Sequence, residues 1–95
     1  MEINYVIIRR EPHGEVVDTY VMAVANSAID AEEFILNMAE EHSYNTFCEI
    51  MNEENATLEM AIEIAKQAED YYINHTIIFP VPKVWNIVKQ KLVIG

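Results

Sequence analysis

Residues 55–74 form the longest uninterrupted helical pattern in the sequence and constrain its fold more than any other stretch. At about 100° per residue, five polar positions of this stretch share one narrow strip. They are Glu59, Glu63, Lys66, Gln67 and Asp70. The other positions are mostly apolar and cover roughly 220° of the circumference, about twice the arc of a one-sided amphipathic helix. We therefore expect a helix with partners on two sides, capped at its start by Asn55 or Thr57.

The N-terminal part of the chain has the pattern of a β-hairpin. Residues 3–10 and 15–25 are rich in Val, Ile and Tyr, which favour strands. Residues 11–14 between them are Glu-Pro-His-Gly, and proline and glycine favour a turn. A four-residue loop gives a register in which a charge pair and an aromatic pair align. The facing pairs are Arg10 with Glu15, Ile8 with Val17, and Tyr5 with Tyr20. Further along, residues 76–79 fit either a third short strand or a continuation of the preceding helix.

Three more segments have helix signals. Residues 30–33 and 46–49 each have capping-box spacing, and the second would open a short helix that ends near Met51. Pro82 suits the first turn of a last helix over residues 82–92. Together these patterns predict an α+β fold in a single domain, residues 1–95. In this fold the N-terminal antiparallel β-hairpin, with or without a third short strand near 76–79, packs against three to four helices.

The composition is that of a globular chain, with 52% hydrophobic and 23% charged residues. A single cysteine, Cys48, rules out an internal disulfide framework and fits a reducing compartment. No apolar run approaches the roughly 18 residues of a membrane span, and the first residues lack the basic and apolar regions of a secretion signal. We therefore expect a cytoplasmic protein that does not bind membranes.

The net charge of −10 is concentrated in the middle of the chain. Residues 30–70 contain twelve acidic side chains against Lys66 alone, which gives this segment a charge of −11. Residues 1–29 carry −2 and residues 71–95 carry +3. Such a distribution should repel nucleic acid and anionic membranes and attract basic surfaces.

Catalytic chemistry has few candidates in this sequence. Cys48 could act as a nucleophile only with a base such as His13, His42 or His75, and a lone cysteine is more often a small core residue. With two glycines in the whole chain, there is no phosphate-cradling loop and no dinucleotide-binding fingerprint. We therefore expect no catalysis and no cofactor.

Metal and phosphate sites are also weakly supported. No EF-hand loop or Glu-x-x-His pair accompanies the three carboxylates nearest the middle of the chain, which are Glu49, Glu53 and Glu54. Arg9 and Arg10 could bind phosphate, but the simpler interpretation has them solvated at the hairpin end and paired with acidic neighbours. The six basic residues form no continuous patch in sequence, so we expect no direct contact with nucleic acid.

The charge pattern leads to our first hypothesis, a small acidic protein-binding module. Its carboxylates would occupy the groove that a basic, nucleic-acid-binding protein otherwise offers to DNA or RNA. The composition is similar to that of small acidic inhibitors of nucleases and defence complexes, which are often phage-encoded, and such a protein would act in the host cytoplasm. The candidate contacts are Glu40, Glu41, Glu49, Glu53, Glu54, Glu59, Glu63 and Asp70.

The alternative hypothesis is a non-catalytic structural or assembly subunit whose acidity only keeps it soluble. The last predicted helix has one apolar face, and the chain ends in an apolar run, which would suit a homodimer contact. The candidate interface residues are Trp85, Val88, Leu92 and Ile94.

Overall fold

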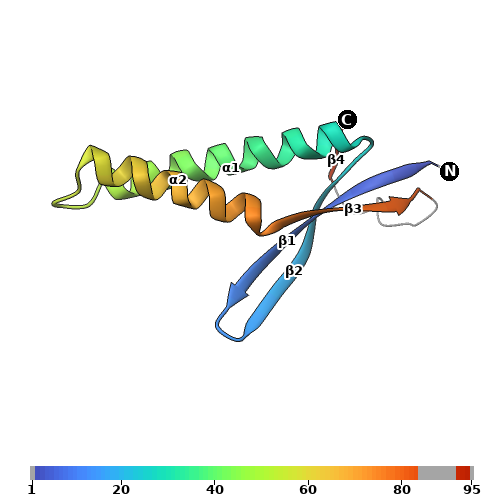
Figure 1. Cartoon of the computed structure of the whole chain (residues 1–95), viewed down its shortest axis with the longest axis horizontal. Helices are drawn as coiled ribbons and strands as arrows, with labels where there is room; N and C mark the ends of the chain where they lie inside the picture. The colour runs from blue at the N-terminus through green and yellow to red at the C-terminus, as the bar shows by residue number, and fades with distance from the viewer. Residues whose placement is uncertain (1, 84–91, 95) are drawn as a thin grey trace. The chain divides into compact units, whose positions relative to one another are not determined.

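The computed structural model describes residues 2–83 and 92–94 of the chain. Its elements follow in the order β1 (Ile3–His13), β2 (Val16–Ala25), α1 (Ala28–Met51), α2 (Leu58–Asn74), β3 (Thr76–Pro82) and β4 (Leu92–Ile94), as Figure 1 shows. The chain divides into two compact units. We call Met1–Ile35 with His75–Gly95 the sheet unit, and Leu36–Asn74 the helical unit. A single domain over residues 1–95 stays a prediction.

The sheet unit is built around β1, which has a neighbour on each side. The strand order is β3-β1-β2-β4, with β1 antiparallel to both β2 and β3 and with β4 parallel to β2. The backbone amide of Asn26 donates to the carbonyl of Ile94 at 3.1 Å and extends the pairing of β4. Because β1 is central, its neighbouring residues Val6 and Ile7 are both buried although they face opposite sides of the sheet. Ile7 and Val24 of the paired strands are completely inaccessible to solvent.

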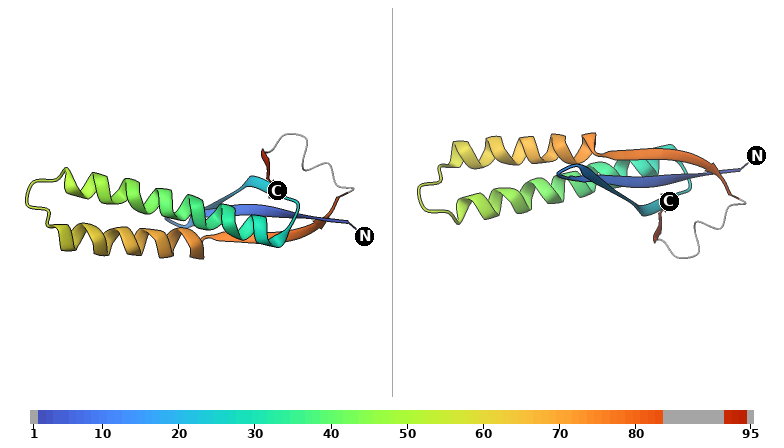
Figure 2. Two further views of the ribbon diagram at one scale, coloured as in Figure 1. Left: turned by 90° about the horizontal axis from the view of Figure 1, so that it is seen from above. Right: turned by 90° about the horizontal axis from the view of Figure 1, so that it is seen from below.

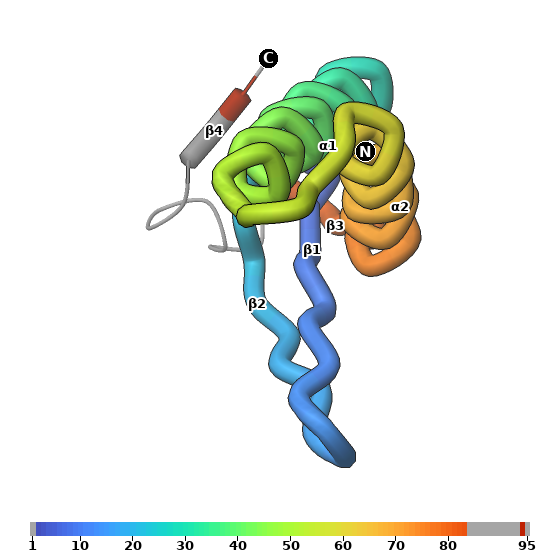
Figure 3. Tube along the Cα trace, turned by 90° about the vertical axis from the view of Figure 1, so that its left-hand side faces the viewer, coloured from blue at the N-terminus to red at the C-terminus, as the bar shows by residue number. Residues whose placement is uncertain are grey.

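The hairpin is present, but its predicted register is wrong. Arg10 pairs with Thr19, Ile8 with Val21 and Tyr5 with Ala25. Our prediction ended the first strand before Pro12, whereas β1 continues through Pro12 to His13 and only Gly14 and Glu15 form the loop. Gly14 has φ +64°, as the first residue of a two-residue type II′ turn requires. The strand tolerates Pro12 because β3 pairs with β1 only as far as Arg9, so that among the described residues β1 has no second neighbour at Pro12. Figure 3 shows β1 and β2 running together to this turn.

Arg9 is a buried residue of the sheet unit and not the solvated one that we expected. Only 4% of Arg9 is exposed. Its guanidinium donates to the hydroxyl of Thr76 on β3 at 3.1 Å and to the carboxylate of Glu11 at 3.5 Å. The hydroxyl of Tyr20 on β2 donates to the same carboxylate oxygen of Glu11 at 3.1 Å. Hydrogen bonds from a charged group offset the cost of burying it, and this network links all three antiparallel strands.

The helical unit contains most of α1 and all of α2, which run in opposite directions (Figure 2). The first helix begins in the sheet unit two residues earlier than the predicted capping box, because Ser27 caps it. The amide of Asp30 donates to the Ser27 hydroxyl at 3.1 Å, and that hydroxyl donates to the Asp30 carboxylate at 2.8 Å. At the start of α2, Thr57 is the cap, since its hydroxyl accepts from the amide of Met60 at 3.2 Å.

The predicted fold of a hairpin packed against three to four helices is wrong. The described residues form three antiparallel strands, β2-β1-β3, and two helices. The short helix predicted to open at Thr46 does not exist as a separate element, because α1 runs unbroken to Met51. There the Thr46 hydroxyl donates to the carbonyl of His42 at 2.9 Å, one turn back in the same helix. The last predicted helix, over residues 82–92, lies mostly outside the described residues.

Neither helix of the described chain combines the length and the apolar character needed to cross a membrane.

The Thr57 cap gives a direct test of the boundary of α2. Replacing Thr57 with Ala leaves the amide of Met60 without its acceptor, so we expect the free energy of unfolding to fall by about 1 kcal/mol. Thr57→Ser keeps the hydroxyl and should stay within a few tenths of a kcal/mol of the wild type. Equilibrium unfolding in urea measures both. Equal unfolding midpoints for Thr57→Ala and the wild type would contradict the assignment of the cap.

Candidate protein-binding surface on the helical unit

All eight carboxylates predicted to contact a partner belong to the helical unit, and all eight are exposed. With Glu69, this unit carries nine acidic side chains against Lys66, a net charge of −8. Within the described ranges, none of the nine forms an ion pair. The ion pairs found there join Arg9 and His13 to neighbouring acids and Lys83 to Glu2, all in the sheet unit. The helical unit therefore has a strong negative field with one cation of its own.

Three of the predicted residues line up along the outer side of α2. Glu59, Glu63 and Asp70 fall within about 40° of one another around the helix axis, and Lys66 lies beside them. Glu59 and Glu63 are about 6 Å apart along the axis, which is shorter than the screening length of about 8 Å at physiological salt. Their charges therefore act on an approaching partner together.

The predicted acids of α1 do not form one row. At about 100° per residue, Glu40, Glu41 and Glu49 point in three different directions around the helix. Glu40 lies on the side that faces the groove described below, whereas Glu49 lies nearly opposite. The predicted contact residues of α2 therefore form one row, whereas those of α1 point in different directions.

Glu53 and Glu54 lie in the turn between the two helices. Asn55 in this turn has φ 67°, a left-handed conformation that asparagine tolerates better than most residues. The two carboxylates line a hollow of about 300 Å³ together with Asn55, Ala56 and Met60. In the part of the chain that the structure describes, no three side chains of His, Cys, Asp or Glu gather as metal ligands.

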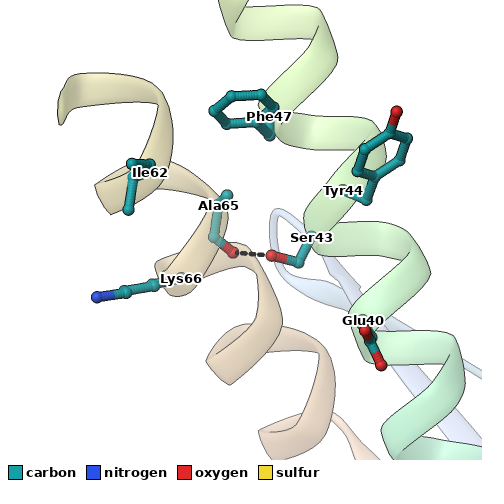
Figure 4. Close-up of a pocket in the computed structure, with 7 residues that line it drawn as sticks. All are labelled: Glu40, Ser43, Tyr44, Phe47, Ile62, Ala65 and Lys66. Atoms are coloured by element: carbon teal, nitrogen blue, oxygen red, sulfur yellow. Dashed lines mark hydrogen bonds between the residues drawn. The ribbon is translucent and has the colours of Figure 1, made fainter. Parts of the chain in front are cut away.

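A second hollow of about 300 Å³ lies between α1 and α2, and we call it the interhelical groove. Its lining, drawn in Figure 4, consists of Glu40, Ser43, Tyr44, Phe47, Ile62, Ala65 and Lys66. The ring of Phe47 points from α1 toward Ile62 on α2, and the charged groups of Glu40 and Lys66 lie at the rim. The groove is therefore an apolar surface with one acid and one base at its edges.

A hydrogen bond across the helices forms part of the groove's lining. The hydroxyl of Ser43 donates to the backbone carbonyl of Ala65 at 2.8 Å. A serine side chain is so short that this bond brings α1 close to the backbone of α2 at that point. A second link joins the helices where the rings of His42 and Tyr72 lie 5.5 Å apart. The residues buried in this unit, Ala39, Ala61, Ala65 and Tyr72, are mostly small.

The residues beside the groove are exposed apolar side chains that our sequence analysis did not identify as a site. Tyr44 is 66% exposed and Ile62 is 42% exposed. Met51 and Leu58, which lie one turn further along each helix, are exposed as well. The sequence feature that could have identified this surface was the width of the apolar arc of residues 55–74, which predicted packing partners on two sides of the helix. Part of that arc has no cover among the described residues.

The other candidates from the sequence lie apart from this groove. Cys48 is half-buried on α1, and His42, six positions earlier, is rotated from it by about 120° around the helix. His13 pairs with Asp18 at 3.3 Å in the sheet unit. Of the predicted oligomer residues, Leu92 and Ile94 belong to β4, and Trp85 and Val88 lie outside the described residues.

Comparison with protein-family models, with curated proteins and with solved structures finds no match, so function is inferred from this chain's own residues.

One side chain at the edge of the groove, Tyr44, has a shifted pKa. A hydrogen bond with the side chain of Cys48, one turn along α1, raises the pKa of Tyr44 above its ordinary value of 10.0, and the charge on the sulfur acts in the same direction. The phenol holds its proton more tightly because that proton is shared with the sulfur and because ionisation would place two negative charges side by side.

Alkaline titration of the tyrosine absorbance tests this interaction. We expect Tyr44 to ionise above pH 10.0, and Cys48→Ala to lower its pKa toward that value. Tyr44→Phe identifies the contribution of this side chain among the five tyrosines. A pKa of Tyr44 that stays the same in Cys48→Ala would show that the sulfur is not the cause.

Proposed function

We propose that this chain is a small acidic module that binds the basic surface of a nucleic-acid-binding protein. The observation that supports it best is that all eight predicted carboxylates are exposed on one unit whose only lysine or arginine is Lys66. Folding alone does not favour such a surface. Glu59 and Glu63 are like charges one turn apart, which destabilises a helix by about 0.2–0.5 kcal/mol.

The physical role of this surface would be steering. Complementary charge raises the rate at which two proteins meet and fixes their orientation more than it raises affinity. A unit of charge −8 approaching a basic groove gains from every carboxylate within the screening length of about 8 Å. The same charge disfavours direct binding to DNA, RNA or an anionic membrane. The compartment consistent with this function is the cytoplasm, that of the host if the protein is viral.

The spacing of the charges defines how far the chain could imitate nucleic acid. Along the row formed by Glu59, Glu63 and Asp70 on α2, three carboxylates and Lys66 give two net charges over about 16 Å, or one per about 8 Å. One strand of duplex DNA carries one per about 3.4 Å. The chain would therefore inhibit a basic protein by presenting a negative field of lower density, together with contacts of its own.

Salt dependence and charge-removing variants test this proposal on a partner captured from the native cell. In a variant with Glu59→Gln, Glu63→Gln and Asp70→Asn, three surface contacts worth about 0.5 kcal/mol each are lost, so affinity should fall roughly tenfold at low salt. Titration calorimetry measures the affinity, and duplex DNA added as a competitor should displace the chain from the partner.

The matched control removes the same number of charges from the sheet unit. The exposed residues Glu15, Glu32 and Glu33 serve this purpose when each is changed to Gln. This triple variant should bind with close to wild-type affinity once the change in net charge is matched by salt. An affinity for the partner that does not change with ionic strength would overturn the proposal.

A second candidate is a non-catalytic assembly subunit that forms a homo-oligomer. The observation that favours it is apolar surface at the end of the hairpin, where Val16 and Val17 are both exposed. Isolated two-stranded ribbons gain stability when another surface covers them. The predicted interface near the C-terminus would add Leu92 and Ile94 of β4.

Sedimentation velocity separates the two candidates. The assembly subunit should form dimers at tens of micromolar that persist at high salt, because apolar contacts are not screened. Replacing both Val16 and Val17 with Thr, which keeps β-branching but removes apolar surface, should then shift the population to monomer. A monomer at all concentrations would leave only the acidic binding module.

A further inference from the structure

We propose that the interhelical groove binds one amphipathic helix of the basic partner, with an apolar side chain seated between Tyr44, Phe47 and Ile62. This inference rests on the proposed function and adds the kind of segment that the partner would present. The groove has a volume of about 300 Å³, at the lower end of the range of small-molecule pockets. That size suits a single anchoring side chain better than a whole metabolite.

The apolar surface extends beyond the groove along both helices. On α1, Tyr44, Phe47 and Met51 lie at positions i, i+3 and i+7 on one side of the helix. On α2, Leu58 and Ile62 lie one turn apart on the facing side. Tyr44, Met51, Leu58 and Ile62 are all exposed. The strip from Tyr44 to Met51 is about 10 Å long, which equals the length between anchors at i and i+7 of a bound helix.

The charge around the groove decides what kind of helix would bind. The groove itself is lined by one acid, Glu40, and one base, Lys66. The negative charge around it comes from the other acids of the helical unit, which give that unit a net charge of −8. An incoming helix with Lys or Arg on either side of its apolar stripe would pair with these carboxylates.

The same charge argues against a second copy of this chain as the occupant. Two helical units face to face would bring together −8 and −8, and no basic patch among their described residues would compensate. The occupant that matches both the apolar groove and the net charge of −8 on the helical unit is a basic amphipathic helix.

Synthetic peptides of about 18 residues provide the probe. One peptide places Leu at i, i+4 and i+7 in a Lys-rich background, and the other has the same composition with the Leu positions scrambled around the helix. We expect the patterned peptide to bind at least tenfold more tightly by fluorescence anisotropy. Tyr44→Ala and Ile62→Ala should each weaken it fivefold or more, as expected for residues at an anchor pocket.

The matched control is Met60→Ala, two residues from Ile62 and on the other side of α2. Met60 is 49% exposed, close to the 42% of Ile62, so the two substitutions remove similar exposed surface. Met60→Ala should leave peptide affinity unchanged. Circular dichroism of each variant shows whether the helices are intact, and Tyr44→Phe should retain most of the affinity.

The outcomes separate this inference from the function on which it rests. If both peptides bind equally, if binding is lost at high salt and if it is insensitive to Tyr44→Ala, the acidic module stands and the groove is not its anchor site. If neither peptide binds at low salt, the proposed function fails as well. If Tyr44→Ala or Ile62→Ala instead dissolves a dimer seen by sedimentation, a second copy occupies the groove and the inference is wrong.

Discussion

The hydrogen bond from the Ser43 hydroxyl to the carbonyl of Ala65 holds the two helices of the helical unit close together at their centre. A side chain with a single oxygen beyond Cβ can reach the backbone of another helix only where the surrounding residues are small. Ala39, Ala61 and Ala65 meet that requirement, and each is buried. Larger groups are then left to the sides of the contact, which places Tyr44, Phe47 and Ile62 around an open groove. Small residues at the centre and large ones at the edge thus leave the exposed apolar surface at which the proposed partner would bind.

The charge of the helical unit and its apolar groove support one another physically. Apolar surface exposed on a monomer favours nonspecific association, whereas a net charge of −8 on the same unit repels an identical unit. A partner of the proposed kind would have to satisfy both conditions, by carrying positive charge and by presenting an apolar stripe. Selectivity of this kind comes from rejecting unsuitable partners as much as from attracting a suitable one.

Local patterns in the sequence predicted some features of the fold and misplaced others. The hairpin and the exposure of the acidic candidate residues follow from turn chemistry, periodicity and charge. For residues 76–79 and for the cap of α2 the sequence left two alternatives each, and the structure has the strand and Thr57. The number of helices was wrong because capping-box spacing also occurs within helices. At Thr46 the hydroxyl bonds to the carbonyl of His42 inside α1, which no spacing rule distinguishes from a cap. The hairpin register failed because Pro12 was assigned to the loop, although a strand with one free side accommodates it.

The sequence predicted the exposed carboxylates of the candidate site but not its apolar groove. An acidic residue is exposed almost wherever it occurs, so the positions of the carboxylates could be inferred one by one. Predicting the groove requires knowing which part of the wide apolar arc of α2 is covered by other elements. That depends on where α1 places Ser43 and Phe47.

The outer strand β3 limits how the sheet could be extended. Pro80 and Pro82 have no N–H to offer, so at two alternate positions β3 cannot donate to a foreign strand. Growth of the sheet by addition of another strand is therefore obstructed on that side.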